Sequence, residues 1–381
     1  MANIVYRHYQ RTDDFQLSDL FNRAFQMNGG GFVRTPKGLN WRYIQSPGFE
    51  PEMIQIAEDR DSHKIVGAVY VNLIETVRFN KDIYIVGDIN DVSCLPEYTK
   101  RGIATNLMHR AIDYMKRKNC DLSILSADFK GFARRAIYQR LGYKDFDRCI
   151  VVFGFVKPIV LIKNLPIFTA LFPVFLLYYY LPRFFIKIRF KKKSFLKQFN
   201  YKIFHDSNHQ FYRKTANNFL SKYYNGFPLY SKEKMQWARV QTPAKRHSPT
   251  YILIYQDKKP IGGACITQKN MYAFKYGIKI RIGIIHEIFI EKKAFNTNKE
   301  FNLGYLYLID KIIEAARQRN IGAVIYIGII GDYDLTRNFR KFCFLSFKSI
   351  AIMFKKLKKK VGPLKDKRPL FVPTYVSLGF P

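Results

Sequence analysis

The chain repeats itself, and this repeat limits the folds that are open to it. Trp41 and Trp237, the only two tryptophans, lie 196 positions apart (237 minus 41). The tripeptides QSP at 45–47 and QTP at 241–243 keep the same offset. In both copies an apolar stretch, a charged turn and a second apolar stretch with a glycine follow, which is the pattern of a β-hairpin. The sequence therefore predicts two copies of one α/β unit.

The length of 381 residues suits two domains of ordinary size, each with its own core. We expect an N-terminal domain over residues 1–152, an insertion over 153–215 and a C-terminal domain over 216–381. The insertion is basic, apolar and rich in aromatic residues, and this composition separates it from the two copies of the repeat.

No acidic residue lies between Arg148 and His205, a stretch that covers most of the insertion. The segment 165–182 of the insertion is almost wholly apolar, with Pro173 inside it. Three interpretations are open. The segment packs on the domains or covers a dimer face, it binds at a membrane surface, or it spans a membrane. A span needs about 20 uninterrupted apolar residues. Aromatic residues next to cations are typical of membrane-surface segments, so an anionic membrane surface is one partner open to residues 157–193, beside packing within the protein.

The net charge limits the classes of partner but does not select one of them. The chain has 64 Lys and Arg against 29 Asp and Glu, a net charge of +35, which favours anionic partners such as nucleic acid, lipid headgroups or phosphate-bearing cofactors, although a solvated basic surface is also compatible. Nucleic acid is not expected, because no recognition-helix or RNA-binding pattern accompanies the cations. No group of ligand residues has metal spacing, so no metal is expected.

The cysteines and the N-terminus favour the cytoplasm, with a peripheral position at the inner membrane face as a second expectation. The five cysteines are an odd number and form no CxxC pair, which argues against a disulfide framework. The first ten residues, MANIVYRHYQ, have no apolar region of the kind that a secretory signal carries.

Periodicity in the first copy predicts the order of its elements. Strands are expected over 53–59, 64–79, 83–95 and 122–127, and helices over 13–26, 104–119 and 131–142. Gly142 is placed to end the last helix. Because strands precede helices at the end of this copy, an antiparallel sheet that passes into a βαβ crossover is expected.

A turn in this crossover has the composition of a phosphate site. A strand ends at Pro96, the turn carries Lys100 and Arg101, and a helix begins near Gly102. The start of a helix offers unpaired backbone N–H groups and the positive end of the helix dipole, and both favour phosphate. We expect Gly102 and Ala104 to be small because a side chain would obstruct an anion that lies against the backbone.

At these residues the chain resembles the GNAT superfamily of acyl-CoA-dependent N-acyltransferases. The segment PEYTKRGIA, residues 96–104, resembles the family's loop, in which Arg or Gln, two residues, Gly, one residue and Gly or Ala follow a strand. The segment AIYQRLGY, residues 136–143, resembles its second landmark. The resemblance covers roughly residues 3–150, and the repeat extends it to about 216–355. It implies two GNAT-like domains of mixed α+β and α/β class, each a mostly antiparallel sheet with flanking helices, joined by the basic apolar insertion.

The chain also departs from the family pattern. Thr99 stands at the Arg or Gln position, and Gly131 stands where many members have an asparagine that contacts the cofactor. The second copy keeps only Gly304 of the loop, after an Asn-rich approach that includes an acidic residue. The resemblance therefore implies one competent cofactor site, in the N-terminal domain, and a degenerate C-terminal domain with a basic tail that serves as scaffold or substrate wall.

The resemblance implies acetyl-CoA, or another acyl-CoA, as the co-substrate, and an amine of unknown identity as the acceptor. It places the pyrophosphate at the loop and the pantetheine arm along the end of the preceding strand. The implied cofactor-binding residues are Ser93, Cys94, Leu95, Lys100, Arg101, Gly102, Ile103, Ala104 and Thr105.

Attack of an amine on a thioester needs a proton acceptor and a protonated group for the departing thiolate. Asp88 and Asp91 are the candidate bases, with Asp88 slightly favoured, and their spacing on a regular strand predicts opposite faces. Structural roles for both, a water chain, and the carboxylate of Pro381 are the alternatives. Tyr138 is the candidate acid, with simple packing as its alternative. An acyl intermediate on Cys94 is a minor alternative.

The function expected from the sequence is transfer of an acetyl or other acyl group from acyl-CoA to an amine by direct attack. One alternative is a protein that keeps the GNAT fold for recognition without binding the cofactor. The other is a basic protein that binds nucleic acid or a membrane surface. The pair His286-Glu287 is not expected to be catalytic, because neighbours on a strand face opposite sides.

Overall fold

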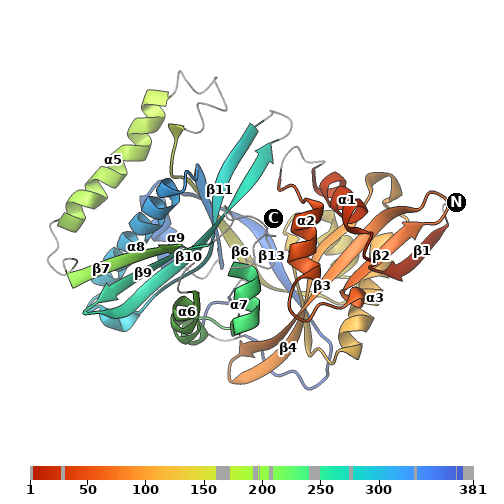
Figure 1. The fold of residues 1–381 in the computed structure, drawn as a ribbon. Helices are drawn as coiled ribbons and strands as arrows, with labels where there is room; N and C mark the ends of the chain where they lie inside the picture. Colours follow the sequence, from red (N-terminus) through yellow and green to blue (C-terminus); the bar gives the residue numbers. More distant parts are fainter. Residues whose placement is uncertain are drawn as a thin grey trace. The chain divides into compact units, whose positions relative to one another are not determined.

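The computed structural model describes residues 3–26, 31–159, 172–191, 196, 198–205, 209–239, 249–273, 278–329, 333–365 and 367–371. They form two compact units, each of which is described by itself (Figure 1). Unit 1 consists of residues 1–149, 224–238 and 349–381, and unit 2 consists of residues 150–223 and 239–348.

Unit 1 is built on a mixed sheet in the order β1-β2-β3-β4-β5-β13. Among the described pairs of this sheet, β4 and β5 run parallel and the other neighbours run antiparallel. A short strand, β8 (Phe227–Pro228), also pairs with β3. The strands are β1 (Ile4–His8), β2 (Ile54–Asp59), β3 (Lys64–Phe79), β4 (Asp82–Cys94), β5 (Leu122–Asp128) and β13 (Leu345–Lys356).

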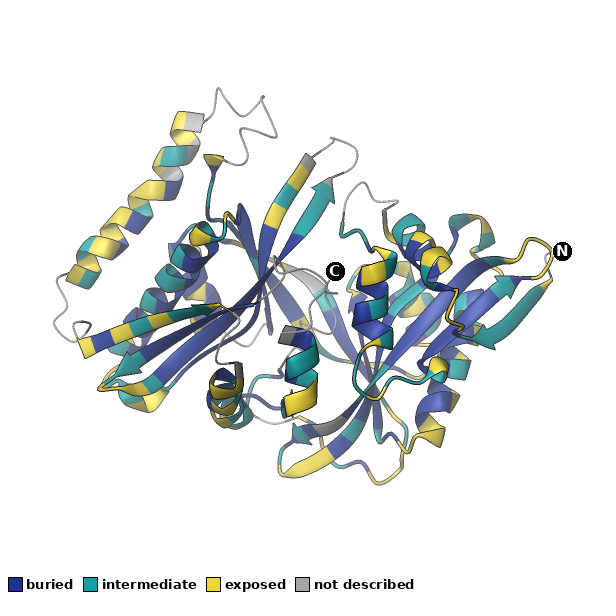
Figure 2. Cartoon of the chain, in the orientation of Figure 1, coloured by how far each residue is buried: buried dark blue, intermediate teal, exposed yellow. Residues whose placement is uncertain are grey.

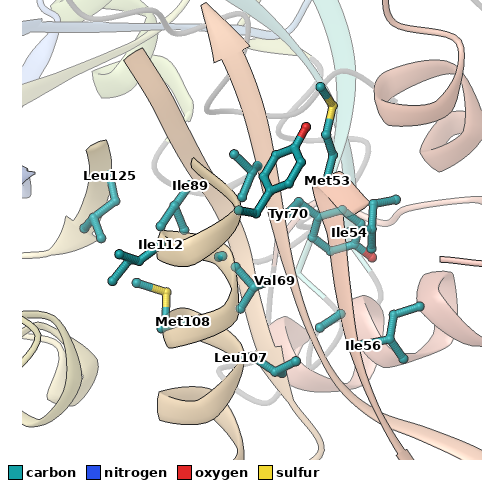
Figure 3. Packing of buried hydrophobic residues seen from close by; sticks show 14 of the residues in the cluster. Met53, Ile54, Ile56, Val69, Tyr70, Ile89, Leu107, Met108, Ile112 and Leu125 are labelled. Carbon is teal, nitrogen blue, oxygen red and sulfur yellow. The ribbon is translucent and has the colours of Figure 1, made fainter. Parts of the chain in front are cut away.

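Helix α3 (Ile103–Arg117) connects β4 to β5 and packs on the sheet. Its apolar residues recur at helical spacing, and Leu107, Met108 and Ile112 lie against Val69 and Ile89 in the core (Figure 3). Two glycines allow this close approach. A Cβ at Gly67 would lie 2.9 Å from Ile103 Cγ2, and a Cβ at Gly87 would lie 2.1 Å from Met115 Sδ. The rest of the described helical residues of unit 1 include α1 (Asp14–Gln26), α2 (Pro36–Leu39), the π-helical turn η1 (Asn40–Ile44) and α7 (Lys232–Arg239).

The elements expected in the first copy are confirmed with one difference. The expected strand over 64–79 is β3, and the expected helix over 13–26 is α1 from its second residue. The helix expected over 131–142 is shorter, because its main part is a π-helical turn, η4 (Arg134–Tyr138). Gly142 has a φ of +82° and reverses the chain, as expected, so that the amide of Tyr143 returns to the Tyr138 carbonyl oxygen at 3.0 Å.

Unit 2 repeats this order of elements around the sheet β6-β12-β11-β10-β9-β7. The hairpin β9–β10 corresponds to β2–β3, and the parallel pair β11–β12, connected by α8, corresponds to β4–β5. The strands are β6 (Lys144–Phe155), β7 (Phe199–His205), β9 (Thr250–Gln256), β10 (Lys259–Ala273), β11 (Ile278–Ile290) and β12 (Ala323–Ile329). The main helices are α5 (Phe172–Lys191), α6 (His209–Tyr223), α8 (Asn298–Gln318) and α9 (Tyr333–Lys341). In both units the most buried residues lie largely on the strands (Figure 2).

The two units differ from the contiguous domains 1–152 and 216–381 that the sequence suggests. Residues 224–238 and 349–381 belong to unit 1, although they come from the second half of the chain. Contacts between the two tryptophans explain why residues 224–238 belong to unit 1. The rings of Trp41 and Trp237 stack at 5.3 Å, and each indole donates a hydrogen bond to the other residue's carbonyl oxygen, at 3.3 and 2.7 Å. The repeated tryptophans therefore bind each other within unit 1.

The insertion expected over 153–215 is part of unit 2. Residues 165–171 of its apolar segment lie outside the described residues, and the remainder of the segment is in α5. Among the helices in the described part of the chain, none has the length and apolarity needed to cross a bilayer. Residues 241–243, the second copy of the tripeptide, and Pro381 also lie outside the described residues.

Candidate functional site

The parallel strands β4 and β5 separate part of the way along the sheet. They pair from Val86↔Leu122 to Ile89↔Leu125. Beyond Ile89, β4 continues to Cys94 in pairing with β3, whereas β5 continues to Asp128 in pairing with β13. Over the described residues, the edge of β4 from residue 90 to 94 is therefore left without pairing to β5. Its backbone groups are available to a ligand there.

The turn after β4 presents the start of α3. The 3₁₀ turn η3 (Pro96–Tyr98) is anchored by the Tyr98 hydroxyl, which donates to Asp59 Oδ2 at 2.6 Å. Lys100 and Gly102 both have a positive φ, +62° and +78°. Gly102 is the N-cap of α3, and among the described residues no side chain caps the helix there. The first-turn amides of Ile103, Ala104 and Thr105 have no intrahelical acceptor, as in any helix, so an anion would satisfy them.

The space in front of this turn is open. Lys100, Arg101 and Gly102 are exposed, and a Cβ at Gly102 would have no described atom within 4 Å. This open space leaves room for the anion that the sequence predicts there. The backbone conformation is a second reason for glycine at this position, because a φ of +78° strains other residues.

The cationic side chains lie beside the turn. Arg101 Nη2 donates to the Glu97 carbonyl oxygen at 3.2 Å, and its guanidinium carbon lies 5.0 Å from the centre of the Tyr98 ring. Thr99 Oγ1 donates to the Pro96 carbonyl oxygen at 2.8 Å, so it stabilises the turn. Gly131 is the second residue that departs from the family pattern. Its backbone amide donates a hydrogen bond to the Asp128 carbonyl oxygen at 3.0 Å.

The three residues expected along the pantetheine arm lie at the end of β4 and just after it. Ser93 and Leu95 are buried, and the Ser93 hydroxyl lies 3.4 Å from the Ala68 carbonyl oxygen. Burial, with a smaller contribution from Glu97, raises the pKa of the Cys94 thiol to about 11. A thiol with this pKa stays protonated at neutral pH, which disfavours an acyl intermediate on Cys94.

Asp91 is held in a buried ion cluster. Its Oδ2 lies 2.5 Å from Arg34 Nη2 and 3.9 Å from Arg42 Nε, and the Tyr43 hydroxyl donates to the same oxygen. Arg34 and Arg42 are both buried, and the Asp91 side chain is only 11 % exposed. These contacts leave little of the carboxylate available to a substrate and favour a structural role.

The expectation that Asp88 and Asp91 face opposite sides of the sheet is wrong. The pairing moves from Tyr70↔Asn90 to Ala68↔Ser93, so two residues of β4 oppose one of β3 in a β-bulge, and Asp91 has a φ of +47°. Tyr43, which binds Asp91, stacks on Tyr70 at 4.3 Å. Because Asp88 is opposite Asn72, two residues from Tyr70, it shares the face of Tyr70.

Asp88 has the environment of a proton acceptor. It is 4 % exposed, and burial raises the pKa of its carboxyl group to about 7. A hydrogen bond that Asn90 Nδ2 donates to Asp88 Oδ2 at 3.1 Å has the opposite, smaller effect on this pKa. A carboxylate with this pKa exchanges its proton near neutral pH, which is what general base catalysis needs.

Tyr138 lies in the core of unit 1. It is buried, its ring is 6.4 Å from that of Tyr143, and burial raises the pKa of its hydroxyl group. The hydroxyl therefore keeps its proton at neutral pH, as a general acid must. This position fits the packing role, and the acid role stays a prediction.

A cavity of about 760 Å³ in unit 1 was not foreseen from the sequence. It is lined by the chain after η1, by β3, by the end of α3, and by the segment from β8 to α7, over residues 46–53, 72–74, Ile85, Lys118 and 228–237. Lys118 Nζ lies 2.6 Å from Glu50 Oε1, and Lys234 Nζ donates to the Leu73 carbonyl oxygen at 2.7 Å. Its lining residue Asn72 is the cross-strand partner of Asp88. Among the sequence patterns, only the repeated tryptophan pointed to residues 228–237, which form one wall of this cavity.

The corresponding helix start in unit 2 is already satisfied by side chains. Thr297 Oγ1 accepts from the Glu300 amide at 3.1 Å, and Glu300 Oε2 accepts from the Asn296 amide at 3.0 Å. This capping box occupies N–H groups and places an acidic side chain where a phosphate would lie. The expectation of a single cofactor site, in the first copy, therefore has a structural basis.

Gly304 allows helix α8 to pack closely against Phe295 and Ile290. It is buried in α8, and a Cβ there would lie 2.4 Å from Phe295 Cζ and 2.9 Å from Ile290 Cδ1. We expect Gly304→Ala to lower the free energy of unfolding by about 1–3 kcal/mol through overpacking, although alanine favours helix by about 1 kcal/mol. Urea unfolding measures this loss. Stability equal to or above wild type would contradict the packing role.

His286 is buried with its Nε2 atom 2.7 Å from Thr267 Oγ1, which fits a structural role for this side chain. Within the described ranges, no group of three or more metal-ligand side chains could hold an ion.

Comparisons with known proteins agree with this fold. Residues 5–145 match the family model described as an acetyltransferase (GNAT) domain. A search of curated proteins finds no significant match. Structures of Saccharomyces cerevisiae N-myristoyltransferase with bound myristoyl-CoA are similar, one with a TM-score of 0.67 at 10 % identity over 93 % of this chain and 79 % of that chain. Another, with myristoyl-CoA and inhibitors, has a TM-score of 0.66 at 11 % identity over 93 % and 80 %.

At such identities the structural likeness establishes the fold, and it extends over both copies of the repeat. Each unit has the mixed, mostly antiparallel sheet with flanking helices that the sequence predicts. With the family match over the first copy, residues 5–145 are a domain of the GNAT acetyltransferase family.

Proposed function

We propose that the protein is an acyl-CoA-dependent N-acyltransferase whose reaction takes place in unit 1. The observation that carries this proposal is the separation of β4 from β5 beside an uncapped, open helix start with two exposed cations. The separation offers backbone groups to an extended amide chain, and the helix start offers N–H groups to a diphosphate. Coenzyme A contains both.

The donor binds with its pyrophosphate on the amides of residues 102–105, beside Lys100 and Arg101. The pantetheine arm follows residues 93–95 along the free edge of β4. Acetyl-CoA is the first donor to test, because the matching family model is an acetyltransferase domain. A long-chain donor is the second, because the similar structures hold myristoyl-CoA.

In the proposed reaction the amine nitrogen forms a bond to the carbonyl carbon of the thioester, and the carbon–sulfur bond breaks. The amine loses its proton to Asp88, which later releases it to solvent. The coenzyme A thiolate takes a proton from Tyr138, which regains one from solvent. The products are an amide and free coenzyme A, without a covalent enzyme intermediate.

The acceptor reaches Asp88 from the cavity in unit 1. Asn72 lines this cavity and lies opposite Asp88 on the neighbouring strand, and directly opposed side chains have Cβ atoms about 4.5–5.5 Å apart. Glu50 and Glu233 line the same cavity and would attract a protonated amine. Apolar lining residues, including Ile85 and Trp237, suit an amphipathic acceptor.

The test is release of free coenzyme A thiol from acetyl-CoA and myristoyl-CoA with a panel of primary amines, with products identified by mass. Amine-dependent release and a product heavier by the acyl group are expected for one donor. Calorimetry with coenzyme A separates the outcomes. Binding without transfer points to an untested acceptor or a recognition role, and no binding of coenzyme A, acetyl-CoA or myristoyl-CoA overturns the proposal.

The two cations beside the loop should contribute to donor affinity. We expect the double variant Lys100→Ala with Arg101→Ala to weaken coenzyme A binding by at least about tenfold, because charge-assisted hydrogen bonds to phosphate contribute about 1.5–3 kcal/mol each. The control is Lys116→Ala with Arg117→Ala, which removes two cations at the other end of α3. Equal affinities for the two double variants would exclude a pyrophosphate at this turn.

A further inference from the structure

Helix α5 has two different faces, and one of them packs on the rest of unit 2. Tyr179 is buried, and its hydroxyl donates to the Val156 carbonyl oxygen at 2.6 Å. Arg183, one turn later, is also buried, and its Nη2 donates to the Phe155 carbonyl oxygen at 2.9 Å. Its guanidinium carbon lies 3.4 Å from the centre of the Tyr179 ring. These polar contacts fix the orientation of the helix.

The other face of α5 exposes large apolar side chains, which are 45 % to 69 % accessible: Val174, Leu177, Tyr180, Leu181, Phe184 and Phe185. At 3.6 residues per turn they cover an arc of about 140° around the helix. Figure 2 shows the exposed residues along α5. Scattered single apolar residues are normal on a protein surface, but a contiguous row on one helix face indicates a binding surface.

The charged residues beside this apolar row indicate which partner it binds. On the helical projection Lys187 borders the arc on one side and Arg189 on the other, and both are exposed. The chain has no acidic residue from 148 to 205, so the segment itself does not offset these cations, and Asp310 and Glu314 of α8 are the acidic residues that attract Lys187. An apolar arc bordered by cations, with aromatic residues in it, matches a bilayer interface that carries anionic headgroups.

We propose that α5 lies in the plane of an anionic phospholipid surface, with the row from Val174 to Phe185 in the headgroup and acyl boundary and with Lys187 and Arg189 on lipid phosphates. Tyr179 and Arg183 keep the helix on unit 2 while its opposite face enters the lipid. This proposal does not depend on the acyltransferase reaction, because it concerns a surface of unit 2.

The test is co-sedimentation of the full chain with vesicles of phosphatidylcholine alone and of phosphatidylcholine mixed with phosphatidylglycerol. Binding is expected to the mixed vesicles and to weaken with salt. The double variant Phe184→Glu with Phe185→Glu is expected to lose at least about tenfold in partitioning, because it places two charges in the apolar arc. Lys187→Gln with Arg189→Gln is expected to lose about 30-fold, at about fivefold per cation.

The control is Phe347→Glu, which adds a charge at an exposed phenylalanine outside α5 and should leave partitioning unchanged. Circular dichroism checks that each variant is folded. Absence of binding by the intact chain overturns the proposal, as does equal binding by the Phe184 and Phe185 variant. Concentration-dependent dimerisation that the same variant abolishes, without vesicle binding, would assign the row to a second copy of the chain and also overturns it.

Discussion

Asp88→Asn is expected to lower kcat/KM by about 10²–10⁴-fold, the usual contribution of a general base. The amide has nearly the same size as the carboxyl group, so it fits the same buried position, but it cannot accept the proton of the amine. In the wild-type protein kcat/KM should fall as pH decreases below about 7, because the pKa of Asp88 is raised by burial to about 7. The variant should lose this inflection. A pH–rate profile of both proteins measures it.

Coenzyme A affinity is the control, since Asp88 does not lie at the phosphate turn, and it should be unchanged in Asp88→Asn. A variant with wild-type activity and the same inflection near pH 7 would show that a water chain or another group accepts the proton. A variant that loses donor affinity together with activity would indicate a disturbed fold.

The same pKa makes stability depend on pH in a defined direction. The folded state holds a proton on Asp88 up to a pKa of about 7, whereas an unfolded aspartate has its ordinary value of 3.8. Between these values the folded state binds more protons, so the free energy of unfolding should decrease as pH rises from about 4 to 7. In Asp88→Asn this contribution to the slope should be absent. Urea unfolding at several pH values compares the two slopes.

Asp91→Asn is expected to lower the free energy of unfolding by about 3–5 kcal/mol, because it removes the carboxylate of a buried ion pair and leaves the buried charge of Arg34 without this partner. Arg34 Nη2 lies 2.5 Å from Asp91 Oδ2, with 3 % and 11 % of the two side chains exposed. Urea unfolding measures the loss. The control is Asp19→Asn, because Asp19 forms an exposed pair with Arg23 at 4.0 Å and should change stability by at most about 1 kcal/mol.

A second variant separates the charge from the shape of the site. Arg34→Met with Asp91→Asn removes both charges and should recover part of the stability lost by Asp91→Asn alone. Wild-type stability of Asp91→Asn together with a large loss of activity would move the role of base from Asp88 to Asp91.

The sequence determined the local elements and the character of the loop. Alternating and helical periodicities predicted β3 and α3 closely, because each pattern reports the burial of one face of a single element. The residues Lys100, Arg101 and Gly102 predicted an open, cationic helix start for the same reason, since a turn and a cap depend on neighbouring residues. The repeated tryptophan predicted two copies of one unit.

Tertiary structure decided the features that depend on residues far apart in the chain. A bulge opposite β3 brought Asp88 and Asp91 to one face, and pairing with buried Arg34 separated their roles. Trp237 became part of unit 1 by stacking on Trp41, and its segment formed one wall of a cavity that is also lined by the partner strand of Asp88. Docking through Tyr179 and Arg183 decided which face of α5 is exposed. Periodicity could not predict these outcomes, because strand register and burial are set by packing between distant segments.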